Sequence, residues 1–191
     1  LLLHFATSKI VASHHLGITL DKILPTTQFQ IRLGKNYFIE IAKVRALRLL
    51  VQTMWKGFEI DVNPSQVMIL CSSNNWDHPS EDKHNHLLEA TTSAMSAILG
   101  GCNALLIRPF NKTFEEQPAL AIRNARNISS ILKEESYLDK VTDPSAGSYY
   151  IESITNQLIE KAWALFLKLE KVPDQETISL STLNNLTSDN D

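Results

Sequence analysis

Apolar and polar residues along this chain follow two alternating periods, one of two residues and one near 3.6 residues. The first period occurs where Phe29, Ile31 and Leu33 alternate with polar neighbours, as in a strand with one face in an apolar setting. A segment with apolar residues at helical spacing follows each strand-like segment, and this succession occurs three times. The predicted strands are residues 27–33, 66–73 and 104–110, and the predicted helices are residues 36–58, 86–99 and 119–136. In the last of these helices, one side is predicted to carry Leu120, Ile128, Ile131 and Leu132.

Strands that alternate with helices predict a parallel sheet covered by helices, which is an α/β fold. Two further helices flank the succession. Residues 2–15 have a helical pattern, and a strongly amphipathic segment runs from the turn at residues 143–147 to Leu169. Beyond it the sequence is polar and acidic, so we predict one domain of residues 1–171 and a flexible tail of residues 172–191.

The composition of the chain argues against several classes of protein. Its 191 residues carry a formal net charge of −3 and its basic residues are dispersed, so no nucleic-acid partner is expected. Cys71 and Cys102 lie in or beside apolar segments, which favours two buried thiols over a disulfide and fits a reducing, cytoplasmic compartment. No apolar run is long enough to cross a bilayer, so no membrane partner is expected. The chain starts with Leu1 rather than Met, which indicates a piece of a longer protein.

Three histidines, His78, His84 and His86, lie close together after the second predicted strand, at the end of the sheet where α/β folds bind ligands. They could chelate a metal ion, with Asp77 as a further ligand. The alternative is a hydrophilic surface loop. The segment contains no cysteine and no HExxH spacing, which favours the loop, and the chain has no nucleophile elbow, phosphate-binding glycine loop or dinucleotide fingerprint. The residues alone therefore predict an α/β domain without a competent active site.

Four segments of the chain carry a family resemblance. They are "NYFIEIAKVRALRLL", "LLEATTSAMSAILGG", "RNARNISSILKEES" and "DPSAGSYYIESITNQLIEKAWALF". In this order they resemble the methylmalonyl-CoA mutase family, and the resemblance extends from about Gln28 to Glu170. It implies an eight-stranded β/α barrel in which adenosylcobalamin, bound by a separate C-terminal domain, supports a radical rearrangement of acyl-CoA thioesters. The resemblance implies that this chain is a partial (β/α)8 TIM-type barrel, the C-terminal portion of the complete one.

The chain departs from the family pattern at positions that the resemblance makes functional. Glu89 stands where catalytic members carry an arginine that holds the substrate carboxylate, and Leu106 stands where they carry a histidine that polarises the thioester carbonyl. Thr26 and Gln28 replace an arginine and a serine. These departures resemble the small, non-catalytic subunit of heterodimeric mutases, whose partner is a catalytic large subunit.

The family's cobalt-binding DxHxxG motif does not occur in the chain, so we expect this chain itself to bind no adenosylcobalamin. Three strands cannot close a barrel, and their open edges predict self-association where no partner covers them. The apolar face of the last helix, with Ile154, Leu158, Leu165 and Phe166, is likewise expected to lack its full set of neighbours. The alternative interpretation is a catalytic acyl-CoA mutase of altered substrate specificity. In it, Arg108, two positions beyond Leu106, binds the carbonyl or carboxylate of the substrate.

Overall fold

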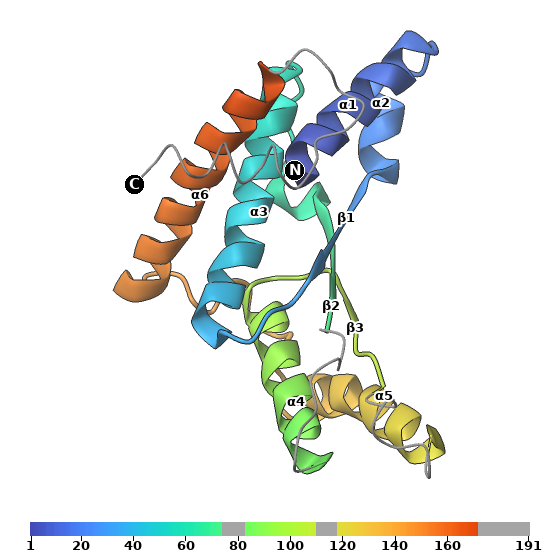
Figure 1. The fold of residues 1–191 in the computed structure, drawn as a ribbon, viewed down its shortest axis with the longest axis vertical. Helices are drawn as coiled ribbons and strands as arrows, with labels where there is room; N and C mark the ends of the chain where they lie inside the picture. The colour runs from blue at the N-terminus through green and yellow to red at the C-terminus, as the bar shows by residue number, and fades with distance from the viewer. Residues whose placement is uncertain (74–82, 110–117, 172–191) are drawn as a thin grey trace.

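The computed structural model describes residues 1–73, 83–109 and 118–171. Parallel strands alternate with helices in it, which confirms the predicted α/β class (Figure 1). The predicted tail of residues 172–191 lies outside the described residues. The elements are α1 (Leu2–His15), α2 (Leu20–Ile23), η1 (Leu24–Thr26), β1 (Gln28–Arg32), α3 (Tyr37–Gly57), η2 (Pro64–Gln66), β2 (Met68–Ser72), α4 (Lys83–Leu99), β3 (Ala104–Leu106), α5 (Pro118–Glu134) and α6 (Tyr149–Glu170).

The three strands form one parallel sheet in the order β1-β2-β3. The register places Gln28 beside Met68 at one end of the β1–β2 pair, and Arg32 beside Ser72 at the other end. On the other side of β2, Ser72 lies beside Leu106 of β3. In the described part of the chain, β1 and β3 each pair only with β2, so the outer edge of each is open.

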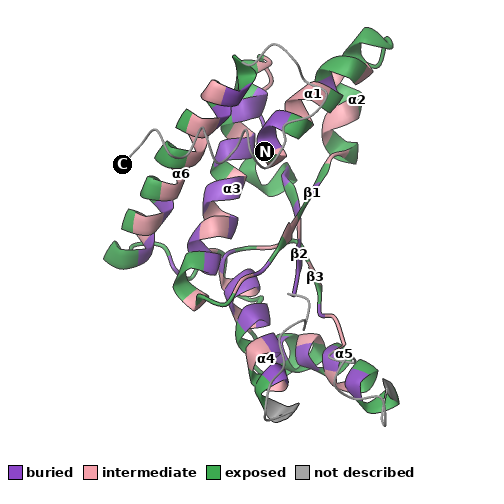
Figure 2. Ribbon diagram, in the orientation of Figure 1, coloured by how far each residue is buried: buried purple, intermediate pink, exposed green. Residues whose placement is uncertain are grey.

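Within the described residues, helices cover one face of the sheet, and most side chains on the other face are exposed. Phe29, Leu33, Ile69 and Cys71 are buried in a core that α1, α3 and α6 complete, and Figure 2 shows this core as the buried sides of α3 and α6. Side chains alternate across a strand, so the residues between them point the other way. We call that side the open face, and its residues are Gln28, Gln30 and Arg32 of β1, Met68, Leu70 and Ser72 of β2, and Ala104 and Leu106 of β3.

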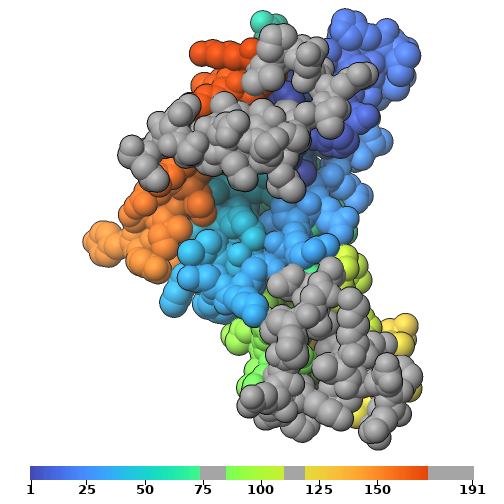
Figure 3. All heavy atoms as spheres, viewed as in Figure 1, coloured from blue at the N-terminus to red at the C-terminus, as the bar shows by residue number. Residues whose placement is uncertain are grey.

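A second, smaller core joins α4 to α5. Small residues dominate it, including Ala90 and Ala94 of α4 and Ala121 and Ala125 of α5. Figure 1 shows these two helices at the end of the molecule to which the strands run, while α1 and α2 lie at the opposite end. The space-filling view in Figure 3 shows α3 and α6 packed side by side on one face.

Arg45 of α3 holds the segment that leads into α6. Its guanidinium makes two contacts of 2.9 Å with the carboxylate of Asp143 and donates to Glu152 at 2.7 Å. Asp143 has a φ of +46°, in the left-handed region that aspartate tolerates better than most residues. The Arg45 contacts therefore fix a turn of unusual backbone geometry against α3.

The burial of α6 corrects one detail of the sequence interpretation. We expected its apolar face to lack neighbours in an incomplete barrel. Phe166 is instead only 8% exposed within the first core, because α6 packs along α3, while Ile154, Leu158 and Leu165 are half-buried.

Cys71 and Cys102 are free thiols, as predicted, with Cys71 buried and Cys102 half-buried. Two causes raise the pKa of the Cys71 thiol: the larger is a hydrogen bond with Cys102, and the next is burial. The thiol therefore stays protonated.

Candidate functional site

The carboxyl ends of the three strands bring one row of side chains together on the open face. Because β1, β2 and β3 are parallel and in register, Arg32, Ser72 and Leu106 lie next to one another across the sheet. Parallel α/β sheets bind their ligands at this end of the strands. This row is therefore the first candidate for a functional site.

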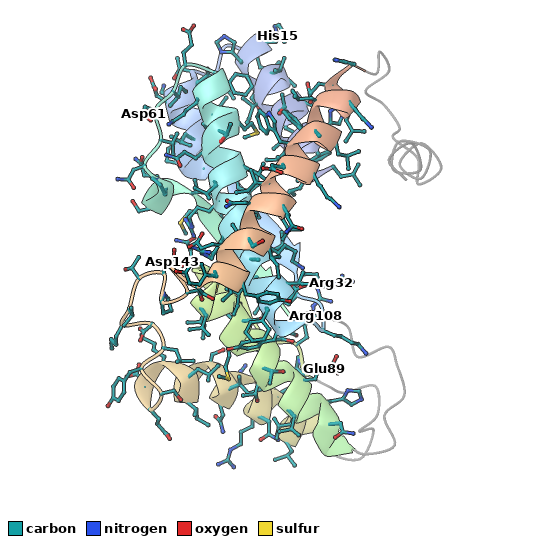
Figure 4. The ribbon with its side chains drawn as sticks, turned by 90° about the vertical axis from the view of Figure 1, so that its left-hand side faces the viewer. His15, Arg32, Asp61, Glu89, Arg108 and Asp143 are labelled. Carbon is teal, nitrogen blue, oxygen red and sulfur yellow. The ribbon has the colours of Figure 1, made fainter. Side chains whose placement is uncertain are left out.

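An open hollow of about 350 Å³ lies at the β1 side of this row. Arg108 follows β3 and reaches the same hollow, and its backbone N–H donates a 2.9 Å hydrogen bond to the Ser73 hydroxyl oxygen. Figure 4 shows Arg32 and Arg108 near each other, with Glu89 beyond them on α4. The residues that line the hollow are Gln30, Ile31, Arg32, Ser72 and Arg108.

Leu106 ends β3 with its side chain 47% exposed. Its carbonyl accepts a 2.9 Å hydrogen bond from the backbone N–H of Ser73, so the strand end is held firmly to β2. The hydrocarbon side chain can neither donate a hydrogen bond nor exchange a proton. At this position of β3, no polar side chain is therefore available to a reacting carbonyl.

Glu89 lies two turns into α4 with basic groups on two sides. One carboxylate oxygen is 3.8 Å from the Lys35 ammonium, and the other is 4.0 Å from Nδ1 of His86. The Lys35 side chain is well exposed, so water screens its pair with Glu89. Glu89 thus brings a negative charge to this end of the sheet, and the Lys35 ammonium lies close enough to compensate part of it.

His86 contradicts the prediction that the histidines of this segment lie on the surface, because its side chain is fully buried. The physical reason is that α4 begins at Lys83, three residues before the predicted start. His86 is thereby one helical turn from the buried Ala90 and shares its face.

The metal hypothesis stays a prediction. Within residues 1–73, 83–109 and 118–171, no three histidine, cysteine, aspartate or glutamate residues come together as metal ligands. His78 lies outside the described residues, and so does the side chain of His84.

Comparison with known proteins identifies the family. The family model described as methylmalonyl-CoA mutase matches residues 3–173. The chain belongs to the methylmalonyl-CoA mutase family. The methylmalonyl-CoA mutase small subunit of Porphyromonas gingivalis is 38% identical to it over 156 residues, which cover 81% of this chain and 25% of that protein.

Two further mutases match the chain over a similar length. The methylmalonyl-CoA mutase of Rhizobium meliloti is 36% identical over 155 residues, or 81% of this chain and 22% of that protein. The methylmalonyl-CoA mutase large subunit of Porphyromonas gingivalis is 34% identical over 158 residues, or 82% of this chain and 22% of that protein. The chain spans about a quarter of the length of the mutases that it matches.

Sequence reasoning singled out Leu106, Glu89 and Arg108, and the structure places all three at the carboxyl end of the sheet. It missed Arg32 and Ser72. The available signal was their position as the last residues of their strands, where parallel sheets present side chains to a ligand.

Among the described helices, none has the length and apolar content needed to cross a membrane.

Proposed function

We propose that this chain is part of a structural, non-catalytic subunit of a heterodimeric methylmalonyl-CoA mutase. That enzyme is an adenosylcobalamin-dependent isomerase, which interconverts methylmalonyl-CoA and succinyl-CoA. Residues 1–171 form the C-terminal portion of its barrel domain, and residues 172–191 form a polar tail. The observation that carries the proposal is Leu106 at the end of β3, because a hydrocarbon side chain there cannot polarise a thioester carbonyl.

The charge of Glu89 supports the same proposal. A substrate carboxylate that approaches α4, where catalytic members carry the arginine, meets the Glu89 carboxylate instead, which raises the energy of an anion bound at that position. Lys35 lies 3.8 Å from Glu89 and reduces this repulsion, but it does not replace the arginine that the resemblance implies for a catalytic chain.

The described histidines do not fit the cobalt of adenosylcobalamin. His86 is fully buried, and His4 is buried with its Nδ1 2.7 Å from the Glu170 carboxylate. His14 and His15 lie at the end of α1, away from the carboxyl ends of the strands. A cobalt ligand must present a ring nitrogen toward the cofactor. We therefore propose that this chain binds no cobalamin and that the cofactor belongs to the catalytic subunit.

The proposed partner is a catalytic large subunit. Porphyromonas gingivalis has a relative named as the small subunit and another named as the large subunit, which supports a two-chain enzyme. The open outer edges of β1 and β3 need strands from the rest of a barrel. Without them we expect the 191-residue chain to self-associate, and a homogeneous monomer in analytical ultracentrifugation at micromolar concentration would contradict this. A cytoplasmic location fits the two free thiols.

The test uses the natural polypeptide that carries residues 1–191, alone and mixed with the large subunit from the same source. With adenosylcobalamin and methylmalonyl-CoA supplied, we expect no succinyl-CoA from the polypeptide alone. We expect co-elution with the large subunit in gel filtration, and turnover by the mixture. Turnover by the polypeptide alone overturns the proposal.

The second candidate is a catalytic acyl-CoA mutase of altered substrate specificity, and the position of Arg108 in the hollow favours it. Under the leading proposal, the double variant Glu89→Arg and Leu106→His still produces no succinyl-CoA, because that proposal assigns the cofactor to the catalytic subunit. Under the second candidate, Arg108→Gln abolishes a turnover that the wild-type polypeptide shows with some acyl-CoA. A panel of acyl-CoA thioesters separates the two.

A further inference from the structure

We propose that the open face of the sheet binds a small oxyanion, a carboxylate or a phosphate group, between Arg32 and Arg108. Both arginines line the same hollow of about 350 Å³, together with the amide of Gln30 and with Ser72. The inference goes beyond the subunit role and does not depend on it, because an anion can bind here whether or not the chain supports turnover.

The register of the sheet brings the two guanidinium groups to the hollow from opposite sides. Arg32 on β1 lies beside Ser72 on β2, and Ser72 lies beside Leu106 on β3. Arg108 is two residues beyond Leu106, which in an extended chain places its side chain on the same face. The two arginines thus flank Ser72, one from each neighbouring strand.

The backbone at both arginines is held in place. The Arg32 carbonyl accepts a 3.0 Å hydrogen bond from the Lys43 ammonium, and the Arg108 N–H donates to the Ser73 hydroxyl oxygen at 2.9 Å. A fixed backbone removes the entropy cost of ordering the main chain when a ligand binds, so only the two arginine side chains remain to be ordered. The hollow is therefore a partly preorganised site.

The charges around the hollow favour an anion. Among the described residues, no carboxylate forms an ion pair with the Arg32 guanidinium. Two acidic side chains of the adjoining helices have basic neighbours of their own, since Glu40 pairs with Lys43 and Glu89 lies beside Lys35. A guanidinium presents a planar fork of donors that matches a carboxylate or a phosphate in a bidentate contact.

The size of the hollow limits the ligand. A volume of about 350 Å³ is at the lower end of ordinary ligand pockets, so it suits a single oxyanion group with a short attachment. Arg32 is exposed and Arg108 is half-buried, and this mixture allows the ligand to enter from solvent.

The experiment is a calorimetric titration of the natural polypeptide that carries residues 1–191, with any subunit that copurifies. The probes are inorganic phosphate and acetate, each at constant ionic strength in chloride, and the stronger binder identifies the source of the oxyanion. We expect one saturable site per chain, and at least tenfold weaker binding for Arg32→Gln and for Arg108→Gln. Arg123→Gln removes an exposed arginine of α5 outside the hollow and should bind as the wild type does.

Two further measurements keep the test decisive. Circular dichroism and a thermal melt of each variant show whether it folds, and Arg32→Lys keeps the charge while it removes the fork. We expect Arg32→Lys to bind more weakly than the wild type and more tightly than Arg32→Gln. Absence of saturable binding for both anions overturns the proposal. Equal binding by the wild type and the folded Arg32→Gln variant, or an equal loss in Arg123→Gln, also overturns it.

Discussion

The Arg48 side chain of α3 fastens the loops that precede β2 and β3, so its removal should destabilise the whole sheet. Its guanidinium donates to the carbonyls of Pro64 at 2.6 Å and Val67 at 2.7 Å, before β2. It also donates to the carbonyl of Gly101 at 2.6 Å and to Oδ1 of Asn103 at 2.8 Å, before β3. One side chain thus joins three elements that are distant in sequence.

The magnitude follows from the exposure of these contacts. A hydrogen bond to a charged donor contributes about 1.5–3 kcal/mol, so four would give an upper bound of about 6–12 kcal/mol. Water can replace the arginine at the three exposed acceptors, whereas the Val67 carbonyl is part-buried and loses its partner. We therefore expect Arg48→Met to lower the free energy of unfolding by about 2–4 kcal/mol. For a domain of this size, that lowers the melting temperature by roughly 5–15 °C.

The assay is urea unfolding of the natural polypeptide, followed by circular dichroism, with three variants. Arg48→Lys reaches fewer acceptors with a single ammonium and should lose about half as much stability as Arg48→Met. Arg126→Met, an exposed position of α5, is the matched control and should lie within about 0.5 kcal/mol of the wild type. If Arg48→Met also lies within that margin, the four contacts contribute nothing to stability and the reasoning is wrong.

Two further predictions concern helix packing and acid stability. A methyl group at Gly100 would lie 2.9 Å from Cβ of Val44, so Gly100→Ala should force α4 away from α3 and lower stability by about 1–3 kcal/mol in a urea titration. Gly57→Ala, where no atom lies within 4 Å, should cause no loss. A hydrogen bond from Arg45 lowers the pKa of Glu152, so the pair stabilises the fold at neutral pH and this contribution is lost as the pH falls through the lowered pKa. Thermal melts below about pH 4.5 should therefore fall less steeply for Glu152→Gln than for the wild type, and equal slopes would contradict this.

The order and type of the elements could be predicted, because apolar periodicity reports them directly. Which residues of a helix are buried was harder to predict. For α5 we expected Leu120, Ile128, Ile131 and Leu132 to line one side. Ile128 and Leu132 are buried, but Leu120 and Ile131 are 44% and 45% exposed. Ala121 and Ala125 are buried beside Ile128 and Leu132, because α5 packs against α4 through small residues on both helices. Side-chain size therefore misled half of the prediction, since close helix packing also buries alanine.

The site was predictable only in part, because it depends on how the strands are aligned. Sequence reasoning identified Leu106 and Arg108 individually from the third strand. It could not place Arg32 beside Ser72, since the register of parallel strands is set by packing between segments that are about 40 residues apart. The burial of His86 was missed for a local reason, because α4 starts one turn earlier than the apolar pattern indicates.

The residues at the carboxyl ends of the strands disfavour catalysis on a thioester and favour the binding of an anion. Leu106 removes the polar group that a thioester carbonyl needs, while Arg32 and Arg108 place two positive charges within one hollow beside it. Positive charge without a proton donor or acceptor of suitable pKa can bind an anion but cannot move protons. A binding role without turnover is therefore the combination that these side chains favour, and the calorimetric and activity assays test its two halves separately.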